Sequence, residues 1–273
     1  MLEKITYINH VNEVIDIGNG SIFVNENDLR DFAWSVTSKN DRISAFKKGV
    51  VKKAIPLQIV CDSEEEGIAI RNRIFEVMEK DVLAMQHGRI TIGNYYLKCY
   101  VTGSRKSEYL KRRGLLTLKL TVHTDFPEWI KESTTTFNYG AGTAGTNLDF
   151  NSDFPFDYTS NLIGQSLNNT GFVESNFIIR IYGACSNPKI TISGHDYEVS
   201  ATFGADEYLT INSIDKTIIL TKSNGTTVNC FNLRNRDSYI FEKIAVGMNT
   251  VAASGNFKFD ITLLEERGEP KWT

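Results

Sequence analysis

The side chains that most often bind metals or move protons are spread singly along this chain. The histidines stand at positions 10, 87, 123 and 195, and the sequence has no HxH, HExxH or mixed Cys/His cluster. A zinc or iron site needs several ligands that converge on one point, and short spacings are the signal that predicts it. We therefore expect neither a metal centre nor any other cofactor.

Two pairs of adjacent carboxylates, Asp206 with Glu207 and Glu265 with Glu266, come nearest to an acid–base pair. Neighbouring side chains on a strand point to opposite faces, so neither pair readily acts on one substrate. A glycosidase pair assembled from separate strands stays open. The GxSxG, P-loop and GxGxxG motifs are absent from the sequence. We predict that the chain is not an enzyme.

The four cysteines, at positions 61, 99, 185 and 230, form no CxxC pair, and three of them lie in or beside apolar runs. Buried, reduced thiols are the expected state. Residues 1–7 alternate like a strand and lack the apolar core of a signal peptide, and no run approaches the ~20 apolar residues of a membrane span. These features predict a soluble chain made in the cytoplasm, with no membrane partner.

Length and charge suggest two domains and argue against nucleic acid as a ligand. A chain of 273 residues with 41% hydrophobic content can fill one large core or two ordinary ones, and composition shifts near the middle. The net charge of −3 divides into about +2 for residues 1–130 and −5 for residues 131–273. Neither half has the strongly basic balance typical of phosphate-backbone binding.

The first half reads as a domain of strands with one helix, residues 1–130. Alternating apolar residues predict strands within 1–26 and at 56–61, 89–92, 95–101 and 115–122. A capping box, Ser63 with Glu66, and apolar residues recurring every three to four positions predict a helix over residues 63–81.

Two basic segments of this half are candidate contact surfaces. Residues 29–56 form an arm with aromatic ends and four lysines within residues 46–53, which is either a solvated hairpin or an extension that wraps a neighbouring subunit. Residues 105–113 are either a solvated loop or a docking surface. The predicted contact residues are Trp34, Arg42, Phe46, Lys47, Lys48, Lys52, Lys53, Arg105, Lys106, Lys111, Arg112 and Arg113.

The second half reads as an antiparallel β-sandwich. Residues 131–148 are rich in Ser, Thr and Gly and are predicted to be a linker. Apolar residues then alternate through 177–220 and again through 257–263, so the last strand must pair with a sheet laid down earlier. The sandwich domain is assigned to residues 149–273. Its end is unusual, because Arg267, Pro270 and Trp272 predict a docked terminus or an aromatic waiting for a partner.

The sequence as a whole resembles the distal tail proteins of long, non-contractile-tailed phages, the siphovirus Dit family. The segments that carry the resemblance, by their order and spacing, are residues 153–158, 177–183, 187–190, 207–216, 240–244, 247–249 and 266–272.

The resemblance implies a fold, an assembly and a location. The fold would be mainly β with one helix: an N-terminal ring-forming α+β or β-sandwich domain related to tail-tube proteins, followed by a galectin-like β-sandwich. Six copies would form the baseplate hub ring at the phage tail tip, assembled in the host bacterial cytoplasm. Its partners would be the tail tube protein and the tail-associated tip protein, with a receptor-binding protein and a second stacked ring as further candidates. The arm would be the belt that embraces the next protomer.

One alternative function stays open, a carbohydrate-binding module that recognises host cell-wall glycans. A galectin-like topology does not by itself imply sugar binding. The sequence has no counterpart of the galectin His-x-Asn-x-Arg set, and Arg234 with Arg236 is the nearest approach to it.

Overall fold

A computed structural model describes residues 4–18, 20–24, 26–106, 114–139 and 165–272 of the chain. The chain divides into two units by its internal contacts. The first unit comprises Met1–Lys131 with Glu266–Thr273, and the second comprises Glu132–Glu265. The described residues are mostly strand, with one long helix, as predicted from the sequence.

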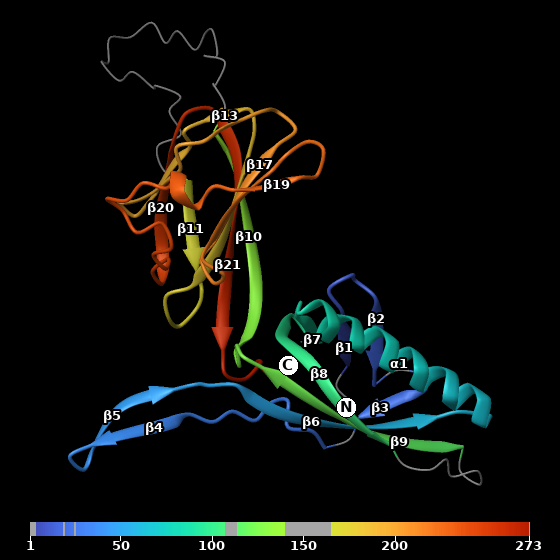
Figure 1. The fold of residues 1–273 in the computed structure, drawn as a ribbon. Helices are drawn as coiled ribbons and strands as arrows, with labels where there is room; N and C mark the ends of the chain where they lie inside the picture. The colour runs from blue at the N-terminus through green and yellow to red at the C-terminus, as the bar shows by residue number, and fades with distance from the viewer. Residues whose placement is uncertain (1–3, 19, 25, 107–113, 140–164, 273) are drawn as a thin grey trace, which may run out of the picture. The chain divides into compact units, whose positions relative to one another are not determined.

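The first unit is built around one long strand, β8, that belongs to two sheets (Figure 1). Its beginning pairs with β7, which pairs in turn with β1 and β2, while its end pairs with β9, which pairs with β6 and then β3. The strands are β1 Ile5–Ile8, β2 Val14–Ile17, β3 Ile22–Val24, β6 Val51–Val60, β7 Gly88–Ile92, β8 Tyr95–Lys106 and β9 Leu115–Thr124.

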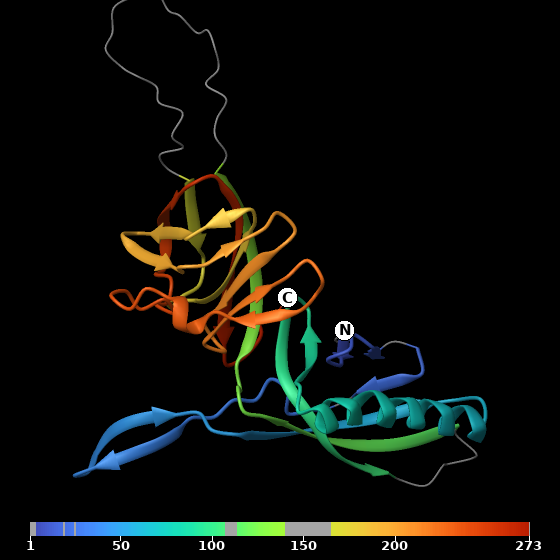
Figure 2. The same cartoon turned by 45° about the horizontal axis from the view of Figure 1, so that its top comes forward.

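The helix α1, Glu64–Ala84, packs against these strands (Figure 2). The predicted capping box is present, because the Ser63 hydroxyl accepts from the Glu66 amide at 3.1 Å. Ile74, Val77 and Met78 are its buried apolar residues. The helix extends three residues beyond the predicted end at 81, because Asp81, which breaks the apolar pattern, sits on the buried face with polar partners of its own.

The arm predicted over residues 29–56 is shorter in the structure. A hairpin of β4 Ser35–Lys39 and β5 Arg42–Lys47 projects beyond the sheet, whereas residues 51–56 belong to the buried strand β6 (Figure 1). The reason is that every second side chain from Lys53 to Ile59 is buried, which places this segment in the core sheet.

Strand β10, Trp129–Tyr139, occupies part of the segment predicted to be a linker. Trp129 and Ile130 pair with β8 in the first unit, and Phe137 is buried in the core of the second. Threonine is common in strands as well as in loops. The Ser/Thr-rich composition therefore did not distinguish a strand from a linker. Residues 140–148 of the predicted linker lie outside the described residues.

The second unit has two main antiparallel sheets whose inner faces share one core, and a separate two-stranded sheet of β13 and β16. The larger sheet has the order β19-β18-β17-β12-β21-β10, and the smaller has the order β11-β20-β14-β15. The strands are β11 Gln165–Asn169, β12 Asn176–Tyr182, β13 Cys185–Ser186, β14 Lys189–Ile192, β15 His195–Glu198, β16 Thr202–Phe203, β17 Tyr208–Asn212, β18 Thr217–Thr221, β19 Thr227–Asn229, β20 Gly247–Ser254 and β21 Phe257–Arg267.

The last strand closes the second unit in the way that the alternation predicts. Strand β21 pairs with β12, placing Phe259 opposite Ile181 and Leu263 opposite Phe177. The Phe137 and Phe259 rings stack with centroids 5.1 Å apart. Residues 266–273 return to the first unit, although the sequence analysis assigned them to the sandwich.

Candidate assembly surface

The hairpin of β4 and β5 carries large apolar side chains on one face. Val36 lies opposite Phe46 and Ser38 lies opposite Ile43, and the register shifts between Thr37 and Ser38. Because directly opposed side chains share a face, this shift brings Ile43 to the same side as Val36 and Phe46. Trp34, two residues before Val36, joins them.

This apolar face is uncovered in the single chain. Trp34, Val36, Ile43 and Phe46 are between 50% and 61% exposed. The Trp34 and Phe46 rings meet edge to face with centroids 6.3 Å apart, so the side chains already form a cluster. Exposed apolar clusters of this kind usually mark a surface that another molecule covers.

The opposite face of the hairpin is polar and cationic. Register places Thr37 opposite Ala45 and Ser35 opposite Lys47, and these four residues face away from the apolar cluster. The predicted contact residues Arg42 and Lys47 are both exposed. The hairpin is therefore amphipathic although it has no core of its own.

Two contacts, one partly buried and one buried, hold the base of the hairpin on the first unit. The Lys48 ammonium lies 2.5 Å from a Glu128 carboxylate oxygen and 4.3 Å from the centroid of the Trp34 ring. The Trp129 indole N–H donates to the Leu29 carbonyl at 3.2 Å. The hairpin thus projects from a fixed root.

Lys53 differs from the other lysines of the predicted arm. It is only 5% exposed, and its ammonium donates to the carbonyls of Asp28 at 2.8 Å and Asp31 at 2.5 Å. Burial lowers the pKa of Lys53, and the negative charges of Asp31 and Asp28 oppose that shift. Within this chain Lys53 is part of the support of the arm and not of its surface, whereas Lys52 beside it is exposed.

The C-terminal segment packs against the start of the arm. The Arg30 guanidinium donates to the Pro270 carbonyl at 2.7 Å and lies 3.8 Å from the centroid of the Trp272 ring. The Trp272 indole N–H donates to a Glu269 carboxylate oxygen at 2.7 Å. Pro270 is buried, but Trp272 remains 74% exposed. The terminus is therefore attached, and its single aromatic ring, that of Trp272, is still mostly exposed.

The second predicted basic segment is only partly described. Arg105 and Lys106 are exposed at the end of β8. Lys111, Arg112 and Arg113 lie outside the described residues. Arg267 of the predicted terminal set is half-buried, and its Nε donates to the Glu269 carbonyl at 3.3 Å.

One group of side chains that could in principle move protons comes together in the fold. The fully buried Asp81 accepts from the Tyr7 hydroxyl at 2.5 Å and from the His10 backbone amide at 2.8 Å, and its carboxylate lies 2.5 Å from His10 Nδ1. Burial, followed by the hydrogen bond to Asp81, raises the pKa of Tyr7. These contacts fasten α1 to β1, and no local sequence pattern predicts them because His10 and Asp81 are 71 positions apart.

In the described part of the chain, the remaining histidines and carboxylates do not form a cluster that could hold a metal ion. His87 lies 3.1 Å from an Asp125 oxygen, and His123 lies 2.6 Å from the Thr102 hydroxyl. His195 contacts the Tyr239 carbonyl at 3.0 Å. Among the described residues, no three His, Cys, Asp or Glu side chains are placed to hold a metal ion. No helix in the described part of the chain has the length and apolarity to cross a bilayer.

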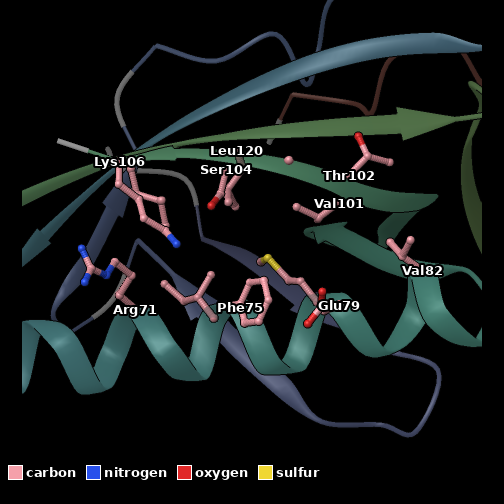
Figure 3. Close-up of a pocket in the computed structure, with 13 residues that line it drawn as sticks. Arg71, Phe75, Glu79, Val82, Val101, Thr102, Ser104, Lys106 and Leu120 are labelled. Carbon is pink, nitrogen blue, oxygen red and sulfur yellow. The ribbon is translucent and has the colours of Figure 1, made fainter.

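The structure also reveals a surface that the sequence analysis missed. A groove between α1 and the strands β8 and β9 has Phe75 among the residues that line it (Figure 3). Phe75 is large and apolar but falls outside the buried stripe of α1. In the sequence, an aromatic residue outside the apolar face of the predicted helix was the feature that could have indicated this groove.

Comparisons with known proteins identify the fold. No family model matches the sequence, and no curated protein matches it significantly. The Dit protein (gp 19.1) of phage SPP1, described as a paradigm of the hub adsorption apparatus in Gram-positive infecting phages, matches with a TM-score of 0.59 and 12% identity over 96% of this chain and 99% of its own.

Structures of the phage P2 baseplate in its activated conformation, with Ca and with Sr, each match with a TM-score of 0.67 and 14% identity over 99% of this chain and 100% of theirs. The chain has the fold of phage distal tail and baseplate hub proteins. The mainly β fold class predicted from the resemblance is confirmed.

Proposed function

We propose that this chain is a structural component of a phage tail, and that six copies form the hub ring that joins the end of the tail tube to the tail tip. The observation that carries the proposal is the β4–β5 hairpin, which holds four large apolar side chains away from either core. The fold shared with phage hub proteins supports the same function.

The apolar face of the hairpin would be costly to leave in water. Fully burying a side chain of this size contributes about 1.5–3 kcal/mol, and about half of each side chain is exposed. Covering all four would therefore contribute roughly 3–6 kcal/mol per contact, which offsets part of the roughly 4–15 kcal/mol that association costs in lost freedom. The fixed root at Lys48 and Trp129 keeps the hairpin extended, so less conformational freedom is lost when it binds.

We infer that the exposed cations of the arm take part in the same assembly. Arg42 and Lys47 on the hairpin, Lys52 beside it and Arg105 with Lys106 at the end of β8 are available for contacts with a neighbouring copy or with the tail tube protein. Lys53 is excluded from this set because it is buried at the root of the arm. The first unit would form the ring, and the protein would reside in the virion after assembly in the host cytoplasm.

The exposed Trp272 offers a second contact surface, for the tail-associated tip protein or another tail component. The Arg30 guanidinium lies over the Trp272 ring, and the side chain is otherwise mostly exposed to solvent. The neighbouring Phe32 is 58% exposed, so two aromatic rings lie uncovered near the start of the arm.

Negative-stain images and the mass in solution of the purified full-length chain test the proposal together. We expect six-fold rings and a mass six or twelve times that of the chain. A monomer at micromolar concentration, with no rings in the images, would refute the hub assignment. Replacing Lys47 and Lys52 by glutamate should weaken ring formation while both units stay folded, as measured by circular dichroism.

A further inference from the structure

Three neighbouring strands of the first unit carry positive charge and no negative charge. Strands β6, β8 and β9 contain two, three and one Lys or Arg residues, respectively, and no Asp or Glu. Helix α1 lies along one side of β6 and β9, where Leu57 and Leu118 enter the core with it (Figure 2). Because successive side chains on a strand point to opposite faces, the residues between the buried ones face away from the helix.

A hollow with a volume of about 290 Å³ opens on this outer face. Arg105 of β8 lies directly opposite Lys119 of β9, and Pro56 of β6 lies on the other side of Lys119. The Arg105 and Lys119 side chains are both exposed. The hollow is lined by Pro56, Leu57 and Gln58 of β6, Arg105 and Lys106 of β8, and Thr117, Leu118 and Lys119 of β9.

The polar side chains of the outer face around the hollow are all able to donate hydrogen bonds. Arginine and lysine only donate, and Gln58 and Thr117 contribute an amide and a hydroxyl group. Like charges directly opposite each other on two strands are destabilising, and none of the three strands has a carboxylate to offset the Arg105–Lys119 pair. An anion bound between the two cations would remove their repulsion.

The lining favours a phosphate ligand over a protein partner. The buried centres of protein interfaces are enriched in aromatic residues and depleted of lysine. Among the described residues that line the hollow, none is aromatic and two are lysines. Phosphate oxygens, by contrast, accept hydrogen bonds mainly from Arg, Lys, Ser, Thr, Asn and Gln side chains and from backbone amides.

The average charge of the first half conceals this face. Residues 1–130 have a net charge of only about +2. Helix α1 alone carries six carboxylates, and it lies on the other side of the sheet. The charges of the two sides therefore nearly cancel in the total, although the outer face by itself is cationic.

We propose that the hollow on the outer face of β6, β8 and β9 is a binding site for phosphate groups, with Arg105 and Lys119 as its charged donors. Free phosphate and the backbone of a nucleic acid share this chemistry, and the experiment distinguishes them. The inference goes beyond the proposed function, because the site belongs to the single chain. Arg105 binds phosphate in this site whether or not it also contacts a neighbouring copy.

Fluorescence anisotropy of a labelled short DNA duplex, titrated with the full-length chain, tests the site. We expect binding that weakens as the salt concentration rises. Lys119→Gln should lower the affinity at least about threefold at low salt. It should also reduce the slope of log K against log salt concentration by about 1, the change expected when one phosphate contact is lost.

A matched pair of arginine variants shows whether the hollow or any exposed cation is responsible. Arg89 of β7 is exposed and lies directly opposite a lysine, Lys98, as Arg105 does, but it does not line the hollow. Arg105→Gln should weaken duplex binding as Lys119→Gln does, whereas Arg89→Gln should change it less than twofold. Equal losses in the two arginine variants, or unchanged binding in Lys119→Gln, would overturn the assignment.

Two competitors identify the ligand. Displacement of the duplex by inorganic phosphate at constant ionic strength would support a site that a single phosphate fills, whereas a duplex that stays bound would support recognition of a continuous backbone. If polyglutamate binds as tightly as the duplex and is equally weakened by Lys119→Gln, the site recognises carboxylates of an acidic protein, and the phosphate assignment is wrong.

Thermal unfolding gives an independent measurement. A ligand that binds only the folded state raises the melting temperature. Inorganic phosphate should therefore raise the melting temperature of the wild type more than that of the double variant Arg105→Gln/Lys119→Gln, which records the general stabilising effect of phosphate on proteins. Equal shifts, together with no binding of the duplex at low salt, would refute the site. Six-fold rings in images of the same protein would then leave the proposed function standing.

Discussion

Replacing Phe46 with serine tests whether the apolar face of the hairpin joins one copy to the next. Phe46 is 57% exposed in the single chain and lies outside both cores, so its loss should leave the folding of either unit nearly unchanged. If a neighbour covers the exposed part, the substitution removes about 1–2 kcal/mol from each contact, a little over half of the 1.5–3 kcal/mol for a fully buried phenylalanine. That is roughly a 5- to 30-fold loss in the association constant of each contact.

The loss is multiplied around a ring, because each copy contributes one hairpin and every contact is weakened. Mass photometry over a dilution series should show rings of the variant dissociating at protein concentrations where wild-type rings persist. Phe172→Ser is the matched control: the same change at a residue 66% exposed, in the second unit. Equal dissociation of the two variants, or none for Phe46→Ser, would refute the reasoning.

Three further predictions concern the first unit. Asp81→Ala should lower the free energy of unfolding by about 2–4 kcal/mol in denaturant titrations, because Tyr7 and a backbone amide lose their buried acceptor; an unchanged midpoint would contradict this. Burial raises the pKa of Tyr7 and of Cys99, so both stay neutral in the folded state at pH values where they ionise in the unfolded state. These two groups make their full contribution to the free energy of unfolding at pH values below their pKa values in the unfolded state, about 8.5 for cysteine and 10 for tyrosine. That contribution should fall as the pH rises above those values. A flat stability profile from pH 8 to 11 would argue against it. Arg30→Ala should release the C-terminal segment, detected as faster proteolysis near Trp272, at a cost of about 1–2 kcal/mol because the contact is partly exposed; proteolysis at the wild-type rate would show that other contacts hold the segment.

The core strands and the start of the helix were predictable because their signals are local. In β12 and β21, alternate side chains such as Ile179, Ile181 and Phe259 must enter the core, and this period appears directly in the sequence. The helix start was equally clear, because Ser63 and Glu66 satisfy backbone groups within one turn.

Features that depend on distant residues were not predictable. Asp81 looked like a break in the apolar face of α1, and only the approach of β1 makes it a buried acceptor. Strand β10 was hidden because its threonines are equally compatible with a linker, until Thr134 and Thr136 contact Thr262 and Asp260 of β21.

The hairpin shows how a backbone irregularity conceals a surface. Ile43 and Phe46 are three residues apart, so a regular strand would place them on opposite faces. The register shift makes Ser44 the extra residue, and both side chains then lie with Val36 on one face. Counting alternation along residues 42–47 therefore gives no apolar face, although the folded hairpin has one.

The same irregularity bears on how assembly would be limited. A flat hairpin with regular alternation would present two equivalent edges and could add strands from other chains without limit. Here the bulge twists the pair, and lysines and an arginine occupy the polar side, so the apolar side is the favourable one to cover. When the rotation between copies closes, a ring is the arrangement in which the apolar face of every hairpin is covered.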